Sequence, residues 1–353
     1  MSSLDTEKFI CGRVLETEKM IGEAVKLLGS AKSFSISSKI PKEWLVKEEE
    51  IWDKKLESRS ESIKNRLNRI LVSGIIEKTK LDYDIDGDVR VVFDFKTGNV
   101  SMQSNEIFIF GRYKKLVPGI SQSRWTCTKC SGKGCPECNG KGKYYLSVEE
   151  VIGEPLKQEA AAEDYVLHAS GREDVDATNS GGRAFVIEIK NPDKRNLDLK
   201  ELEKKIAETG KVIVSDMRIV RRNFVQLVTE SHFDKTYAAE VEFGKEIGEN
   251  EVRKIEELAG KTILQRTPNR VAHRRADLVR QRKVKTIDVR KAKEKTAEIL
   301  ISAEAGTYIK ELISGDEGRT KPSIAEVLGT SAACRRLEVT KIEDGFLDFC
   351  FEN

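Results

Sequence analysis

A cysteine motif that occurs twice in succession constrains this chain more than any other stretch. Residues 127–134 and 135–142 are two copies of one CxxCxGxG unit with no spacer between them. Each unit offers two thiolates at the spacing of a zinc knuckle, and its glycines permit the positive-φ turns that a knuckle needs. We therefore predict a closed structural zinc site whose ligands are Cys127, Cys130, Cys135 and Cys138. Free thiols or a redox pair are the alternative, and because the connector is short the four sulfurs could instead serve two sites with other partners.

The composition favours a soluble protein with more than one domain. The chain has 353 residues, of which 39% are hydrophobic and 34% charged, so it can bury real cores in two or three domains. It shows no apolar run of membrane-spanning length and no signal-peptide pattern, so we expect a cytoplasmic protein without a membrane partner. The net charge is only +3, so any argument for a nucleic-acid partner must come from local clustering.

Hydrophobic periodicity predicts an α+β chain that divides at residue 150. In residues 1–150 we expect helices at residues 12–29, 43–55 and 60–71, a loop at residues 30–42, and strands at residues 89–93 and 108–113. In residues 151–353 we expect strands at residues 165–170, 184–189, 211–220, 235–243, 283–289, 295–303 and 335–342. Strands outnumber helices there, which predicts a large mixed or antiparallel sheet flanked by helices.

Asp174 stands in a loop between two of these expected strands. Residues 165–170 and 184–189 read as short buried strands, and the stretch between them is polar and rich in glycine. A rigid scaffold can present a single carboxylate at such a place. The alternative is an ordinary turn aspartate that caps its own backbone.

The densest basic stretch runs from residue 265 to residue 285. It contains one acid, Asp277, among many arginines and lysines. This pattern suits contacts with the phosphates of a nucleic acid. A solvated surface loop is the alternative interpretation.

Three motifs, in order along the chain, resemble the Pus-ten family of archaeal tRNA pseudouridine synthases. Residues 171–176 (Gly-Arg-Glu-Asp-Val-Asp) are similar to the family's catalytic loop, which has one invariant Asp. Residues 235–239 resemble the second motif, whose Tyr lies beside the target base. Residues 306–311 resemble the third, and also the Gly-Thr-Tyr-Ile-Arg of TruB-type synthases, whose basic residue pairs with the catalytic Asp. The first half of the chain, with the cysteine repeat, resembles the family's accessory domain, which is related to THUMP domains.

The resemblance implies a fold and a reaction. It implies a THUMP-like α+β accessory domain with a zinc knuckle over residues 1–150, and a pseudouridine synthase catalytic domain with a mixed or antiparallel sheet over residues 151–353. Asp174 would act as nucleophile, or as electrostatic stabiliser of the ribose, while uracil is detached, turned and rejoined through C5. Lys310 would pair with Asp174, and Tyr237 would stack on the uracil and could take the C5 proton.

The resemblance also implies a tRNA partner, with uridines 54 and 55 of the T-loop as targets. The target base must leave its stack, so Arg172 and nearby groups would hold the flipped strand. The RNA-contacting residues implied in this way are Arg172, Arg183, Arg266, Arg270, His273, Arg274, Arg275 and Tyr308. We expect structural zinc, no organic cofactor and a monomer. The alternative function is a non-catalytic zinc-containing RNA-binding protein; a chaperone-type zinc module is less suitable, because the four-repeat array and J-type helix of DnaJ are missing.

Overall fold

The computed structural model describes residues 9–12, 15–29, 31–54 and 61–352. Contacts divide the chain into two compact units. Unit 1 comprises the described residues of Met1–Ile107, Glu159–Asp164 and Ile189–Leu197, and unit 2 those of Phe108–Gln158, Tyr165–Glu188 and Asp198–Asn353. This grouping differs from the predicted division at residue 150, because strand β5 (Ile107–Lys115) pairs with β8 (Val212–Val220) and carries the cysteine repeat into unit 2.

In its described residues, unit 1 combines helices with a four-stranded sheet in the order β2-β1-β3-β4. The helices are α2 (Thr17–Leu28), α3 (Lys42–Lys54) and α4 (Ile63–Thr79), and the strands are β1 (Ser33–Lys39), β2 (Asp82–Tyr83), β3 (Val89–Asp94) and β4 (Asn99–Ser104). The prediction of a loop at residues 30–42 is therefore wrong. This serine-rich stretch forms a strand because β2 and β3 pair with it on both sides, and its small Ser35 side chain is buried and donates to Val89 O (3.4 Å).

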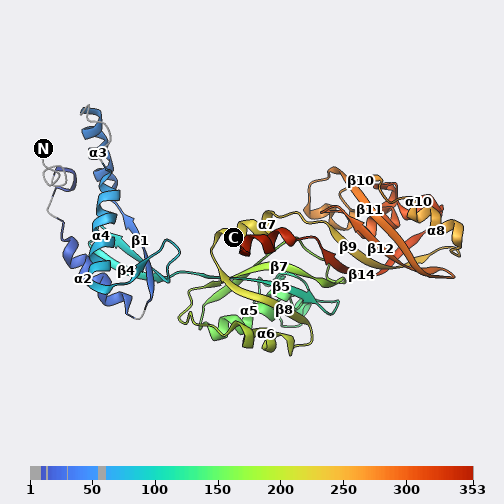
Figure 1. The fold of residues 1–353 in the computed structure, drawn as a ribbon, viewed down its shortest axis with the longest axis horizontal. Coiled ribbons are helices and arrows are strands. Elements are labelled where there is room, and N and C mark those ends of the chain that lie inside the picture. The colour runs from blue at the N-terminus through green and yellow to red at the C-terminus, as the bar shows by residue number, and fades with distance from the viewer. Residues whose placement is uncertain (1–8, 13–14, 30, 55–60, 353) are drawn as a thin grey trace. The chain divides into compact units, whose positions relative to one another are not determined.

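Unit 2 is built on a mixed sheet that has ten strands in the described part of the chain (Figure 1). Its order is β13 (Thr320–Lys321), β10 (Thr262–Arg266), β11 (Val279–Lys293), β12 (Thr296–Ala303), β9 (Lys235–Phe243), β14 (Ala332–Ile342), β7 (Thr178–Lys190), β5 and β8, while β6 (Asp164–Ala169) pairs with β7. Neighbours from β13 to β14 are antiparallel, whereas β14 and β7 are parallel. The predicted mixed sheet is therefore confirmed.

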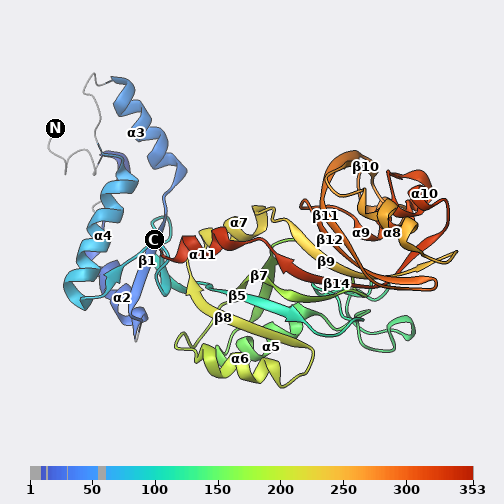
Figure 2. The same cartoon turned by 45° about the vertical axis from the view of Figure 1, so that its right-hand side comes forward.

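Helices cover this sheet in separate groups. Helices α5 (Val148–Glu159) and α6 (Leu199–Ala207) lie on one side of strands β5, β7 and β8, and helices α7 (Asn223–Glu230) and α11 (Gly345–Glu352) lie on the other (Figures 1 and 2). At the other end of the sheet α8 (Glu249–Glu256) packs on β11, α9 (Ile309–Ser314) packs on β14, and α10 (Ile324–Leu328) contacts both helices. Among the described helices, none combines the length and the apolar character that crossing a membrane requires.

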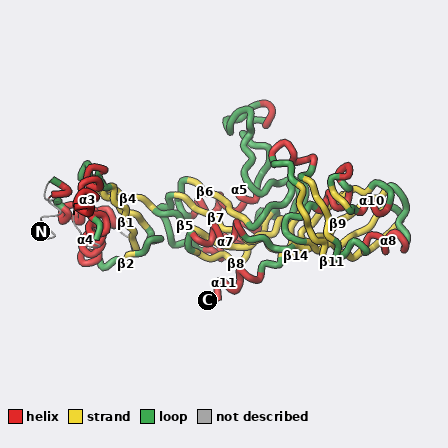
Figure 3. Tube along the Cα trace, turned by 90° about the horizontal axis from the view of Figure 1, so that it is seen from above, coloured by secondary structure: helices red, strands yellow, loops and turns green. Residues whose placement is uncertain are grey.

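Three short 3-10 helices interrupt the loops of unit 2. They are η1 (Pro136–Cys138), η2 (Asn269–Arg274) and η3 (Asp316–Gly318). The first lies in the long loop between β5 and α5, which contains the cysteine repeat. Figure 3 shows this loop extending away from the strands beside α5. The other two lie near α9, and Arg270 of η2 takes part in the site described next.

Candidate active site

The loop between β6 and β7, residues 170–177, is here called the Asp174 loop. A backbone hydrogen bond and a glycine turn shape its base. Ser170 donates its backbone N–H to Ala184 O (3.0 Å), which closes the loop at its base. Gly171 has a φ of +78°, a conformation that residues with a Cβ rarely adopt, and an added Cβ would lie 3.1 Å from Arg183 Nη1. Glycine is therefore the residue that this turn requires.

A buried ion pair between Glu173 and Arg183 lies under the Asp174 loop. Arg183 Nε is 2.8 Å from Glu173 Oε2, and both side chains are only 1% exposed. Tyr113 donates its hydroxyl to Glu173 Oε1 (2.7 Å), Gln122 Nε2 donates to that hydroxyl (2.9 Å), and Arg183 Nη1 donates to Ser170 O (2.6 Å). Burial alone would lower the pKa of Arg183, but the negative charge of Glu173 raises it. Buried charges persist only when they are paired and hydrogen-bonded, so this network fixes the loop from below.

Lys115 supports the same loop from strand β5. Its Nζ donates to the backbone oxygens of Asp174 (3.0 Å) and Val175 (2.9 Å). Burial lowers the pKa of Lys115 to about 8, against the attraction of Glu173. These bonds act on the backbone, so they leave the carboxylate of Asp174 facing the pocket.

The carboxylate of Asp174 meets two cations. Arg270 Nη1 lies 2.7 Å from Asp174 Oδ1, and Lys310 Nζ lies 3.5 Å from Oδ2. Lys310 Nζ is closer to Asp176 Oδ2, at 2.7 Å. Burial alone would raise the pKa of Asp176, but the hydrogen bond from Lys310 lowers it. Arg270 Nε also contacts Glu311 Oε1 at 2.6 Å. The structure thus brings Lys310 to Asp174, as the sequence predicted, but the nearer cation is Arg270.

Asp174, Arg270 and Lys310 line one pocket of about 490 Å³. Tyr237, on strand β9, forms part of its wall, and burial raises the pKa of Tyr237 to about 12. Lys235, two residues earlier on the same strand, also lines the pocket, and burial followed by the repulsion of Arg183 lowers the pKa of Lys235 to about 8. The predicted site residues that line this pocket are Arg172, Asp174, Arg183, Tyr237, Arg270, Arg275, Tyr308 and Lys310.

The predicted RNA-contacting side chains in this wall have different surroundings. The guanidinium of Arg172 lies 5.1 Å from the ring centroid of Trp125, which belongs to the long loop before α5. Arg275 Nη1 donates to the hydroxyl of Tyr308 (2.8 Å), so these two residues form a polar edge. Arg183, by contrast, is buried against Glu173 and faces the protein rather than the solvent.

Among the described side chains, Arg266 is the predicted RNA-contacting residue that does not line this pocket. Arg266 forms an ion pair with Asp277 (2.6 Å) on the outer side of strand β10 and lines a separate cavity that also contains Arg319. The side chains of His273 and Arg274 lie outside the part of the chain that the structure describes.

Several supporting residues were not predicted from the sequence. Tyr113 and Lys115 are two residues apart on one strand, a spacing that places both side chains on one face. That spacing was a usable signal, but nothing in it shows that the face lies under the Asp174 loop. Glu173 lies inside the recognised motif, and Glu311 inside another, yet their partners are distant in the sequence.

The four cysteines of the repeat form one cluster. Their sulfur atoms all lie within 4.8 Å of one another, which allows a single metal ion to bind them. The backbone N–H groups of Gly134 and Gly142 donate to Cys130 Sγ and Cys138 Sγ, each at 3.2 Å. Such donors favour the thiolate form that a metal needs. The donor set therefore fits one four-coordinate ion.

Known proteins resemble this chain over most of its length. The family model described as "Pus10, C-terminal" matches residues 108–343. The curated tRNA pseudouridine synthase Pus10 of Korarchaeum cryptofilum is 38% identical over 358 residues, which cover 97% of this chain and 96% of that protein. The chain belongs to the Pus10 family of tRNA pseudouridine synthases. Its Pus10 relatives from Methanocaldococcus jannaschii and Archaeoglobus fulgidus are 40% and 44% identical, over 94% and 79% of this chain and 73% and 79% of theirs.

Membership of the Pus10 family makes this chain an enzyme of the isomerase class. The family match contains the pocket, the Asp174 loop and the four cysteines. Among solved structures, a Cbf5-Nop10-Gar1 complex is similar with a TM-score of 0.36 and 18% identity, over 65% of this chain and 48% of that chain. A structure described as pseudouridylate synthase has a TM-score of 0.24 and 14% identity, over 72% and 77% of the two chains.

Proposed function

We propose that this chain converts uridine to pseudouridine in tRNA and that Asp174 supplies the single catalytic carboxylate. One observation carries the proposal. Among the described residues that line the pocket, the carboxylates are those of Glu173 and Asp174. Glu173 is buried against Arg183, whereas the side chain of Asp174 is 32% exposed. Asp174 is therefore the carboxylate that a substrate in this pocket can reach.

The pocket offers the groups that the reaction needs besides the carboxylate. The N1–C1′ bond of uridine breaks and a C5–C1′ bond forms within one nucleotide, while the C5 proton leaves and N1 gains a proton. The reaction therefore needs an ionised carboxylate beside the ribose, a surface for the detached uracil and a group or water that accepts the C5 proton. Arg270 and Lys310 place two positive charges beside the carboxylate of Asp174. Tyr237 keeps its phenol protonated, since its pKa is about 12, and offers an aromatic face on which uracil can stack.

The arginines of the pocket support an RNA substrate. The pocket is lined by Arg172, Arg275, Arg280 and Arg282, which can contact phosphates on either side of a flipped nucleotide. We propose uridines 54 and 55 of the T-loop as the targets, as the resemblance to the family implies. A base in a loop costs less to unstack than a base in a duplex, which agrees with this choice.

We further propose that unit 1 is a THUMP-like RNA-binding accessory domain and that the four cysteines bind structural zinc. Soft thiolates at this mutual distance suit zinc, whose structural sites take four such ligands. We propose that the enzyme acts as a monomer in the cytoplasm. Elemental analysis should give about one zinc per chain, and a well-folded metal-free protein with four reactive thiols would contradict the zinc site.

Site mapping on unmodified tRNA transcripts tests the reaction. The protein is mixed with each transcript, and pseudouridine is located with a carbodiimide adduct. We expect pseudouridine at positions 54 and 55 with the native chain and none with Asp174→Asn, which keeps the shape of the residue. The affinity for tRNA should be roughly retained, because phosphate contacts supply most of it.

Asp176→Asn is the matched control. It removes a carboxylate from the same motif that does not line the pocket, so measurable turnover should remain. Clear turnover by Asp174→Asn would disprove the role of Asp174. A native chain that binds tRNA tightly without forming pseudouridine would favour the RNA-binding alternative.

A further inference from the structure

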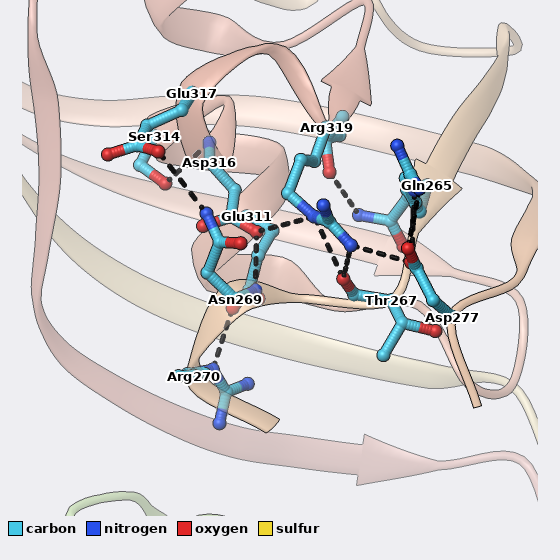
Figure 4. Close-up of polar contacts among 12 residues, drawn as sticks. Gln265, Thr267, Asn269, Arg270, Asp277, Glu311, Ser314, Asp316, Glu317 and Arg319 are labelled. Atoms are coloured by element: carbon cyan, nitrogen blue, oxygen red, sulfur yellow. Dashed lines mark hydrogen bonds and ion pairs between the residues drawn. The ribbon is translucent and has the colours of Figure 1, made fainter. Parts of the chain in front are cut away.

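The basic segment that the sequence assigns to RNA phosphates is anchored to the protein at its beginning. Arg319 Nη2 donates to Thr267 O (2.7 Å) and contacts Asp277 Oδ1 (2.6 Å) (Figure 4). The backbone N–H of Asn269 donates to Asp316 Oδ2 (3.0 Å), next to α9. The residue that follows, Arg270, therefore starts from a fixed position.

The guanidinium of Arg270 contacts two carboxylates at once. Its Nε contacts Glu311 Oε1 at 2.6 Å, and its Nη1 contacts Asp174 Oδ1 at 2.7 Å. The planar guanidinium has several donors in fixed directions, so it can bind both acids at once. A lysine has no such geometry and could not copy this bridge.

Glu311 ties Arg270 to the protein. Its side chain is only 5% exposed, and its second oxygen, Oε2, has no hydrogen-bond partner among the described residues. A buried carboxylate that loses its cation is strongly destabilising, so Arg270 cannot leave Glu311 for a phosphate without a large cost. Burial alone would lower the pKa of Arg270, but the hydrogen bond and charge of Glu311 raise it. Arg270 is thus a permanent cation at this place.

Lys310 alone does not balance the charge of Asp174. Its Nζ is 2.7 Å from Asp176 and 3.5 Å from Asp174, so its charge is shared. The cluster holds three carboxylates, Asp174, Asp176 and Glu311, against the cations Arg270 and Lys310. Removing either cation leaves Asp174 in a distinctly more negative environment.

We infer that Arg270 is a positioning residue for Asp174, not a phosphate contact, and that Glu311 in turn positions Arg270. This inference rests on the proposed catalytic role of Asp174. Through Arg270 the side chain of Asp174 is held toward the pocket, with a positive charge beside it. The basic segment then contributes to the chemical step as well as to RNA binding.

Single-turnover kinetics with saturating enzyme separate these roles. The variants are Arg270→Met, Arg270→Lys and Glu311→Gln, each measured across pH and each also titrated with tRNA at several salt concentrations. The control is Arg290→Ala, which breaks an exposed ion pair with Asp288 on β11, outside the residues that line the pocket. Thermal unfolding shows whether each variant is folded.

We expect the rate of Arg270→Met to fall by about 100-fold, the loss that a misplaced reacting group produces. Its tRNA affinity and salt slope should stay close to those of the native chain. The acid limb of its pH–rate profile should move to higher pH, because a carboxylate that loses a cation takes up a proton more readily. Arg270→Lys should recover part of the rate.

Glu311→Gln should lower the rate less than Arg270→Met, and it should add little when combined with Arg270→Met, because both changes break the same connection. If Glu311 were only structural, its substitution would lower thermal stability and leave the pH–rate profile in place. That result would overturn the inference that Glu311 positions Arg270.

A phosphate-binding Arg270 would behave differently. Arg270→Met would then keep the native single-turnover rate, while the log–log salt slope would fall by about 0.7 to 0.9. This result overturns the inference and leaves the proposed function intact, since Asp174→Asn would remain inactive. Clear turnover by Asp174→Asn would instead overturn the proposed function.

Discussion

Glu173 and Asp174 are neighbours in the sequence, and each is paired with an arginine, yet the two ion pairs have opposite surroundings. The pair of Glu173 with Arg183 is 1% exposed on both sides. The pair of Asp174 with Arg270 is about one-third exposed on both sides, at 32% and 37%. Water cannot replace a partner in the first pair, whereas a substrate can approach the second. The same chemistry therefore fixes the loop in one place and prepares a reacting group in the other.

The largest expected effect comes from breaking the buried pair. Arg183→Met leaves Glu173 buried without a cation, which costs about 3 to 5 kcal/mol in comparable pairs. We expect a large fall in the urea midpoint of unfolding and loss of activity. Combining Arg183→Met with Glu173→Gln should restore part of the stability, because the uncompensated charge is removed. A fully stable Arg183→Met variant would show that the buried pair does not fix the loop.

The next effect concerns the exposed side of the comparison. Lys310→Met should lower the single-turnover rate strongly and move the acid limb of the pH–rate profile to higher pH, with little effect on unfolding. Lys310→Arg should keep much of the rate, since it keeps the charge, although the planar fork occupies space differently. A Met variant with the native rate and profile would exclude Lys310 from the chemistry.

The smallest effect concerns Lys115, which joins the two regions through the loop backbone. Its pKa in the folded protein is about 8, below the ordinary 10.5, so between these values the unfolded chain binds more protons. Stability from this group therefore rises as pH is raised through that window, and below it there is no dependence. Lys115→Met should remove this rise, which urea unfolding from neutral to alkaline pH can measure. Lys235, whose pKa is also about 8, is unchanged in the variant and should still contribute its own part of the rise in stability.

Local patterns in the sequence were sufficient to predict much of the sheet. The alternation in residues 235–243 corresponds to β9, whose buried and exposed residues alternate. The predicted strands at residues 283–289 and 295–303 correspond to β11 and β12, which pair with each other. These signals are local, since a strand with one buried face shows its period directly. Strand β1 was missed because its apolar alternation is confined to Phe34 and Ile36, and because its two partner strands are distant in the sequence.

The candidate site, like the sheet, could be predicted from the sequence only in part. Asp174, Tyr237 and Lys310 belong to short motifs, and the structure places all three in one pocket. The contact of Arg270 with Glu311 joins residues 41 positions apart, and that of Tyr113 with Glu173 joins residues 60 apart. Such pairs follow from the topology of the sheet, which the residue pattern around either partner does not contain.

The residues that hold the Asp174 loop determine where a catalytic fragment of this protein can begin. Tyr113, Lys115 and Gln122 all precede residue 150, and each bonds to the loop or to its buried acid. A shortened chain that began at residue 151 would keep Asp174, Tyr237 and Lys310 and lose all three supports. Such a fragment would contain all three motifs, but its Asp174 loop would lack the hydrogen bonds that hold it in place. The smallest independent catalyst in this chain must therefore begin at or before strand β5.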